Sequence, residues 1–179
     1  MVLRGECAVE MIKWVVLFLL TTLTAASVGF GFSARKVVIV WYHVAVIILL
    51  AFIVFLFFSF TGGMMGEFLP VNVLEVLVGL GMISLGVLIA VIRPVYPGQR
   101  DLLLFVSVLL LDVLILAYRS GYVYDRTFAL AIITSLLLTG GLVGGIVFGE
   151  RKWSNWRVVQ MLPYVPSILF ILLGLIKML

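Results

Sequence analysis

Six long apolar runs occupy most of this 179-residue chain, and their length constrains the fold more than any other feature. Each run has roughly 17–24 residues, close to the ~20 that an α-helix needs to cross ~30 Å of hydrocarbon. Helices satisfy their own backbone polar groups in lipid, and the alternating pattern of a membrane barrel is missing from the sequence. We therefore predict an all-α membrane protein, one polytopic domain over residues 1–179 that forms a bundle of six transmembrane helices with short loops. The predicted helices are 12–32, 37–60, 71–92, 102–118, 127–149 and 157–178.

Composition and charge support a chain whose main partner is the lipid bilayer. Hydrophobic residues make up 65% of the sequence and charged residues 11%, less than half of the ~25% usual in soluble domains. The net charge of +4 comes from Lys and Arg at the ends of apolar runs. Such residues anchor helices at the membrane interface, so the positive charge is no sign of nucleic-acid binding.

The first run has two interpretations. Residues 24–27 resemble a signal-peptide cleavage region, and Met11 is a second plausible start. Because the apolar stretch is long for a signal peptide and five more runs follow it, we expect a retained membrane helix. Residues 1–10 are expected to form an unstructured tail.

The distribution of basic residues predicts an orientation in the cell membrane. The 12 Lys and Arg residues divide seven to five between the two sides of the predicted bundle. The positive-inside rule then places both termini on the non-cytoplasmic side.

Asp112 is the most informative side chain, because it lies inside the fourth apolar run. A carboxylate at that depth costs ~2.5–3.5 kcal/mol on insertion scales, so it should face the protein interior and have a partner. Arg119, two turns further on, is too distant for easy direct contact. Asp112 is therefore either a structural hydrogen-bonding group or a binding or relay residue.

Glu75 and His43 are the other titratable candidates. Glu75 lies about one turn inside the third run, on the same side as Asp112, where the two could bind a cation or share a proton. Its alternative role is contact with lipid headgroups. His43, near the opposite end of the second run, is a weaker candidate and is expected to be an interface residue bonded to backbone or headgroup.

Glycines predict where helices pack closely. They recur at helical spacing in the third run and form overlapping GxxxG pairs in the fifth, which we expect to be the centre of the bundle. Whether these faces contact this chain or a partner is left open. The packing glycines are Gly79, Gly86, Gly140, Gly141, Gly144, Gly145 and Gly149.

Two prolines, Pro163 and Pro166, interrupt the last run. Each removes a backbone donor, so this helix is expected to kink there or to enter the membrane at Pro163.

No catalytic residue, metal site or cofactor is predicted. The sequence has one cysteine and one histidine, which excludes an internal disulfide and a haem held by two histidines of this chain. A nucleophile with a matching base is also missing, so an enzyme is not expected.

Three functional hypotheses follow. The first is a small transporter or transporter subunit for a cation or small solute, with Asp112 and Glu75 at its site. The alternative is a non-enzymatic membrane subunit or assembly factor, homo-oligomeric or bound to a partner membrane subunit through its glycine faces. The third is a redox protein whose second ligand comes from another chain.

Overall fold

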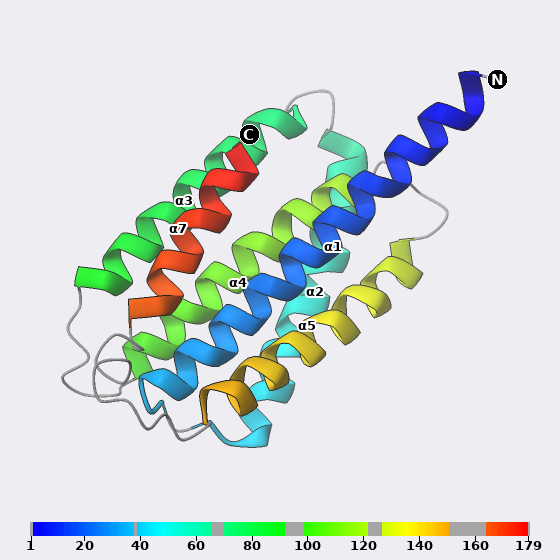
Figure 1. Ribbon diagram of the computed structural model, residues 1–179. Coiled ribbons are helices and arrows are strands. Elements are labelled where there is room, and N and C mark those ends of the chain that lie inside the picture. The colour runs from blue at the N-terminus through cyan, green and yellow to red at the C-terminus, as the bar shows by residue number, and fades with distance from the viewer. Residues whose placement is uncertain are drawn as a thin grey trace.

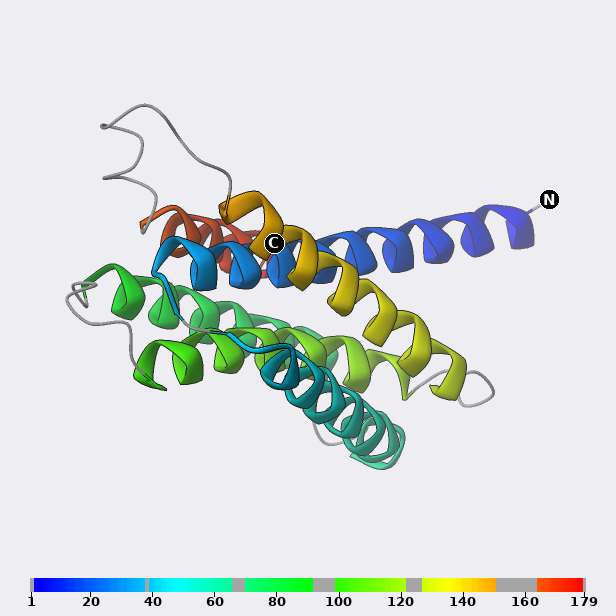
Figure 2. The ribbon, with the colours of Figure 1, turned by 90° about the horizontal axis from the view of Figure 1, so that it is seen from below.

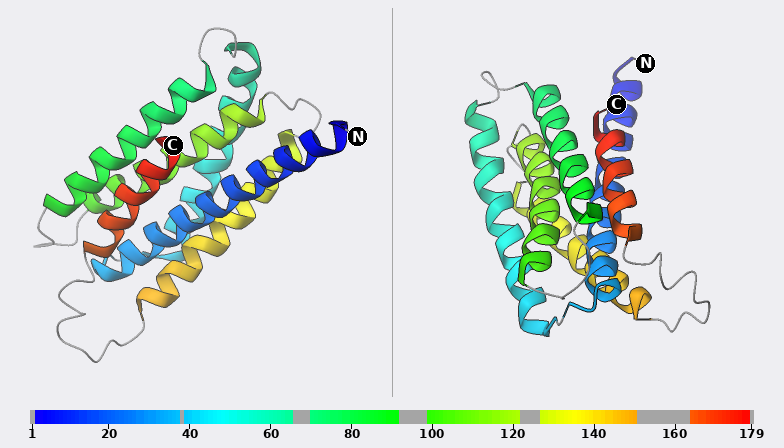
Figure 3. Two further views of the ribbon diagram at one scale, coloured as in Figure 1. Left: turned by 45° about the horizontal axis from the view of Figure 1, so that its top comes forward. Right: turned by 90° about the vertical axis from the view of Figure 1, so that its left-hand side faces the viewer.

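In the computed structural model the described residues, 2–37, 39–65, 70–91, 99–121, 127–150 and 164–178, form an all-helical bundle (Figure 1). Five of the six predicted helices are long and apolar enough to cross a membrane, and the sixth is apolar but shorter in its described part. Successive helices run in alternating directions, so the first and last helices bring both chain ends to the same end of the bundle (Figures 1 and 3). The helices are α1 (Val2–Ala34), α2 (Trp41–Met65), α3 (Val71–Val91), α4 (Gln99–Ser120), α5 (Thr127–Gly149) and α7 (Val165–Met178).

The outer surface of the bundle is apolar. Large side chains such as Leu19, Phe60, Leu103 and Leu136 are each more than 60% exposed, and they are distributed over several helices. Soluble monomers rarely carry contiguous apolar surface on this scale, whereas lipid is a suitable solvent for it. The structure thus has the features of a multi-pass membrane protein.

The bundle is centred on α4, and the expectation that residues 127–149 form its centre is wrong. In the most apolar 18 residues of α4, 61% of the stretch is buried, against 33% in the corresponding stretch of α5. Helix α5 packs mainly on α1 and also contacts α2. Figure 2 shows α5 at the margin of the bundle, alongside α1. Glycines permit a close contact between two helices, but they do not require that either helix be central.

Three described helix boundaries differ from the sequence prediction by four residues or more. Residues 2–10 are helical and continuous with the first span, where a tail was expected. The second helix begins at Trp41 and continues to Met65, past the predicted end at residue 60. It passes through Gly62, where a Cβ would lie 2.6 Å from the Tyr118 carbonyl oxygen of α4. This close contact with α4 outweighs the weak helix propensity of glycine.

The last helix does not kink at Pro166. The described helix begins at Val165, so Pro166 lies in its first turn, where a missing N–H and a fixed φ cost nothing. Pro163 and the rest of the predicted start of this helix lie outside the described residues. The 14 described residues of α7 are fewer than a membrane crossing needs.

Candidate functional site: a buried charge cluster

Asp112 lies in the middle of α4 and is completely buried. Its Oδ1 accepts a hydrogen bond from Nζ of Lys177 on α7, whose side chain is only 4% exposed. The carboxylate therefore has the partner that its depth in the span requires. Its second oxygen, Oδ2, has no hydrogen-bond partner among the described residues.

A second ion pair lies beside the first. Nη1 of Arg119, on α4, donates to Oε1 of Glu75, on α3, at 2.8 Å, and both side chains are about a quarter to a third exposed. The negative charge of Glu75 also acts on Lys177. Glu75, Asp112, Arg119 and Lys177 thus form a charge cluster from three helices, with two acids and two bases.

Close packing of α7 on α3 places Lys177 in this cluster. A Cβ on Gly79 would lie 2.8 Å from the Gly174 carbonyl oxygen, and one on Gly86 would lie 3.0 Å from that of Ser167. A Cβ on Gly174 would in turn lie 2.7 Å from the Gly79 carbonyl oxygen. These contacts hold the two backbones together and bring the last turn of α7 next to the first turns of α3.

A cavity of about 140 Å³ adjoins the charge cluster. Two of its lining residues are charged, Glu75 and Lys177, and the others are apolar side chains of α1, α4 and α7. At ~30 Å³ per water molecule, this volume corresponds to roughly five waters or one small solute. The cavity is lined by Leu17, Leu20, Glu75, Ile115, Ile176 and Lys177.

The role of Lys177 was not predicted from the sequence, where this residue counts among the charges at the ends of apolar runs. Its position carried a usable signal, because Phe170, Gly174 and Lys177 follow each other at helical spacing on one face. The first two of these are buried. A lysine that continues a buried face is a candidate partner for an intramembrane acid.

A third ion pair, which is buried and was also missed, lies at the opposite end of the bundle. Nη1 of Arg35 lies 3.4 Å from Oδ1 of Asp101, in the first turn of α4. Nη2 donates to the carbonyl oxygen of Ile89, in the last turn of α3, and the guanidinium lies 5.8 Å from the centre of the Phe105 ring. Arg35 therefore neutralises the negative end of α3 and links it to α4.

The end of α1 directs Arg35 inward. Lys36 has a positive φ of 53°, and its N–H donates to the Ser33 carbonyl oxygen at 3.0 Å. The next amide, of Val37, donates to the Phe32 carbonyl oxygen at 2.9 Å. This pair of bonds is a Schellman motif, which ends the helix with Arg35 as its last turn residue facing α3 and α4.

His43 lies far from the charge cluster, at the start of α2. Its Nδ1 accepts a hydrogen bond from the Val40 N–H at 3.3 Å, and the His43 N–H donates to the Val40 carbonyl oxygen at 2.8 Å. The first bond is the half of a capping box in which the N3 side chain accepts from the N-cap amide, so the local role of the imidazole is to cap α2.

The glycines of α5 divide into two faces. Gly141, Gly145 and Gly149 lie against α1, where a Cβ on Gly141 would come within 2.6 Å of the Thr22 carbonyl oxygen. Cβ atoms added to Gly140 and Gly144 would meet nothing within 4 Å among the described residues. The predicted packing role of these two is therefore not fulfilled by the described part of this chain. Gly29 of α1, which was not singled out, completes the contact from the other side, against Leu142.

Among the described residues, no three His, Cys, Asp or Glu side chains gather as a metal site would require. Comparisons with protein-family models, with curated protein sequences and with solved structures find no match to this chain. The class of protein therefore rests on the fold and the site: an apolar helical bundle of the multi-pass membrane type, with paired charges in its interior.

Proposed function

We propose that the protein is a small membrane transporter, or the subunit of one, whose substrate is a cation or a small cationic solute. One observation carries the proposal. Lys177 both pairs with the buried Asp112 and lines the cavity that also contains Glu75. A solute in this cavity is thus adjacent to an internal ion pair.

The energetics of a buried ion pair favour the replacement of Lys177 by another cation over separation of the pair with no replacement. Removing one partner from a buried pair costs about 3–5 kcal/mol, because the remaining charge is left without compensation. A cation that replaces Lys177 at Asp112 avoids this cost, and the displaced ammonium can interact with Glu75. The internal lysine then competes with the substrate cation and resets the site after release.

The shape of the bundle suits such a step. Asp112 lies on the central helix α4, whereas Lys177 lies on α7, which is shorter and packs mainly on α3. A small displacement of α7 along the glycine contact with α3 would separate Nζ from the carboxylate without disturbing the core around α4.

Flux in proteoliposomes tests the proposal. Purified protein would be reconstituted and the uptake of alkali cations, protons and small organic cations measured under an imposed gradient. We expect uptake of at least one cation, with loss in Asp112→Asn and with uptake retained in Ser84→Ala, a change on the exposed side of α3. Uptake by Asp112→Asn equal to that of the wild type would refute a transport role for this carboxylate.

A membrane subunit that docks a partner is the second candidate, and the face of α5 around Gly144, which no described residue covers, favours it. Gly144 contributes to an apolar groove of about 240 Å³ between α1, α5 and α7. We propose that the occupant, in this case, is a transmembrane helix of a second copy. Native mass spectrometry would then show dimers that Gly144→Leu removes, whereas monomers in both proteins would exclude this mode.

A further inference from the structure

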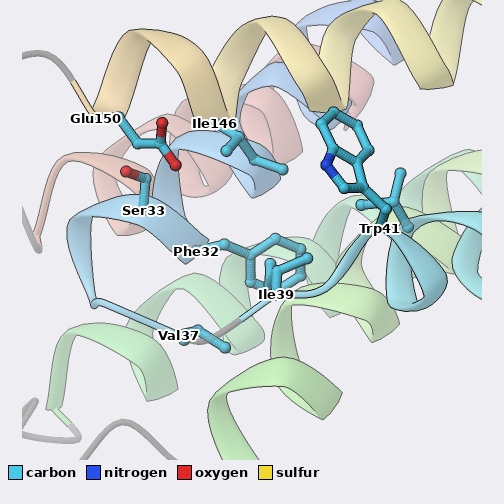
Figure 4. A pocket seen from close by; sticks show the side chains of 8 residues that line it. Phe32, Ser33, Val37, Ile39, Trp41, Ile146 and Glu150 are labelled. Carbon is cyan, nitrogen blue, oxygen red and sulfur yellow. The ribbon is translucent and has the colours of Figure 1, made fainter.

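A second cavity, of about 150 Å³, lies at the end of the bundle opposite the charge cluster. It forms where α1 and α5 end and α2 begins. Figure 4 shows two polar side chains, Glu150 and Ser33, with their oxygens facing each other at one side, and apolar side chains across the rest. The lining residues are Phe32, Ser33, Val37, Ile39, Trp41, Val44, Ile146 and Glu150.

The described groups on the polar side of this cavity contribute negative charge. The C-terminal ends of α1 and α5 both lie there, and each carries the negative end of a helix dipole. Glu150 directly follows α5, and its N–H is bonded to the Ile146 carbonyl oxygen at 3.0 Å. A carboxylate at this position adds to the negative helix end, so the site favours a positive ligand.

Among the described residues, neighbouring charges leave this negative charge largely uncompensated; Arg151 and Lys152, which follow Glu150 in the sequence, lie outside those residues. Arg35 is turned away from the cavity, toward Asp101 and the Ile89 carbonyl oxygen, and Lys36 is exposed. Glu150 forms no ion pair with any residue in the described ranges. The positive end of α2 lies on the other side of the cavity, where the Val40 amide is already bonded to His43.

We infer that this cavity binds an alkylammonium group. The ammonium would donate to the Glu150 carboxylate and to Ser33 Oγ, and its carbon chain would lie against Phe32, Ile146 and Trp41. The volume corresponds to roughly five water molecules, enough for an ammonium group with its first carbons and too small for a whole lipid. Trp41 is 73% exposed, as expected of an aromatic residue at a membrane interface.

The ammonium group has two sources, an ethanolamine headgroup of a membrane lipid and a free amine. Both can be tested on the purified protein in maltoside micelles. Thermal stability would be measured with added phosphatidylethanolamine, with phosphatidylglycerol, and with ethylammonium chloride against sodium chloride at equal ionic strength. Wild type would be compared with Glu150→Gln and with Glu10→Gln, a matched charge removal near the other end of α1.

We expect stabilisation by phosphatidylethanolamine or by ethylammonium, with an apparent affinity about two- to fivefold weaker in Glu150→Gln and unchanged in Glu10→Gln. Stabilisation by the lipid alone assigns the site to a headgroup, and stabilisation by ethylammonium assigns it to free amines. Three results would overturn the inference: equal stabilisation by phosphatidylglycerol, equal affinities in wild type and Glu150→Gln, or no stabilisation by either ammonium probe.

Discussion

The ion pair between Asp112 and Lys177 makes a quantitative prediction about stability. Asp112→Leu leaves a buried ammonium without its partner, and Lys177→Met leaves a buried carboxylate without its partner. Each single change should lower the free energy of unfolding by about 3–5 kcal/mol, whereas the double variant, with apolar side chains of similar volume, should lie close to the wild type.

The two single variants should also differ from each other. In Asp112→Leu the lysine still experiences the negative charge of Glu75, which offsets part of the loss. In Lys177→Met the carboxylate has no such substitute, because the nearest cation on its own helix, Arg119, is bonded to Glu75. Lys177→Met should therefore be the less stable of the two.

Thermal unfolding in detergent, followed by tryptophan fluorescence, measures these differences. For chains of this length 1 kcal/mol corresponds to about 2–4 °C in Tm, so each single variant should lose roughly 6–20 °C. The double variant should recover most of that loss. A double variant as unstable as the sum of the two singles would show that the residues do not interact, and would refute the buried pair.

Three further predictions concern helix contacts and surface charge. Gly145→Leu should destabilise the protein by several °C in Tm and Gly144→Leu should leave Tm nearly unchanged, because only Gly145 lies against α1; equal effects in the same thermal assay would contradict this packing. Lys36→Gly should raise stability by about 0.5–1 kcal/mol, since glycine adopts the positive φ of this position without strain, and a lower Tm would argue against the Schellman motif. The pair of Glu75 and Arg119 is partly exposed, so a double-mutant cycle with Glu75→Gln and Arg119→Gln should give a coupling of no more than about 1 kcal/mol. A coupling as large as that of the buried pair would be inconsistent with this exposure.

The sequence predicted the spans well because hydrophobic length is a local property. The third and fifth helices were expected at 71–92 and 127–149, and they occur at Val71–Val91 and Thr127–Gly149. The hydroxyl groups of α1 also bond to their own helix, as with Thr22 to the Phe18 carbonyl oxygen at 2.8 Å. Such features depend on a few neighbouring residues and on the low polarity of lipid.

The arrangement of the helices could not be predicted in the same way. Asp112 was expected to have a partner, but Lys177 lies 65 residues away in the chain, and only the packing of α7 on α3 brings the two together. Arg35 falls between the predicted helices 12–32 and 37–60, so the sequence placed it in a loop. Its burial depends on a left-handed residue at Lys36, which the sequence does not favour.

The centre of the bundle was misplaced for an instructive reason. The fifth helix has the face richest in glycine. Helix α4 instead contains Asp112, Asp101 and Arg119, each of which forms an ion pair with a residue of another segment. Charged groups must leave the lipid, so the membrane span with the most charge, Asp101–Ser120, has to be the most enclosed. Polar content therefore indicates the central helix better than glycine content does.

The most direct measurement is the thermal stability of Lys177→Met as a function of added cation, beside the wild type and Asp112→Asn. If Lys177 competes with a substrate cation for Asp112, its removal should strengthen cation binding. Stability should then rise by RT ln(1 + [L]/Kd), about 2.7 kcal/mol at a hundredfold excess over Kd. We predict this cation-dependent rise in Lys177→Met, a smaller one in the wild type and none in Asp112→Asn. A Lys177→Met protein that is unstable and not rescued by any cation would contradict the account, and would leave Asp112 and Lys177 with a purely structural role.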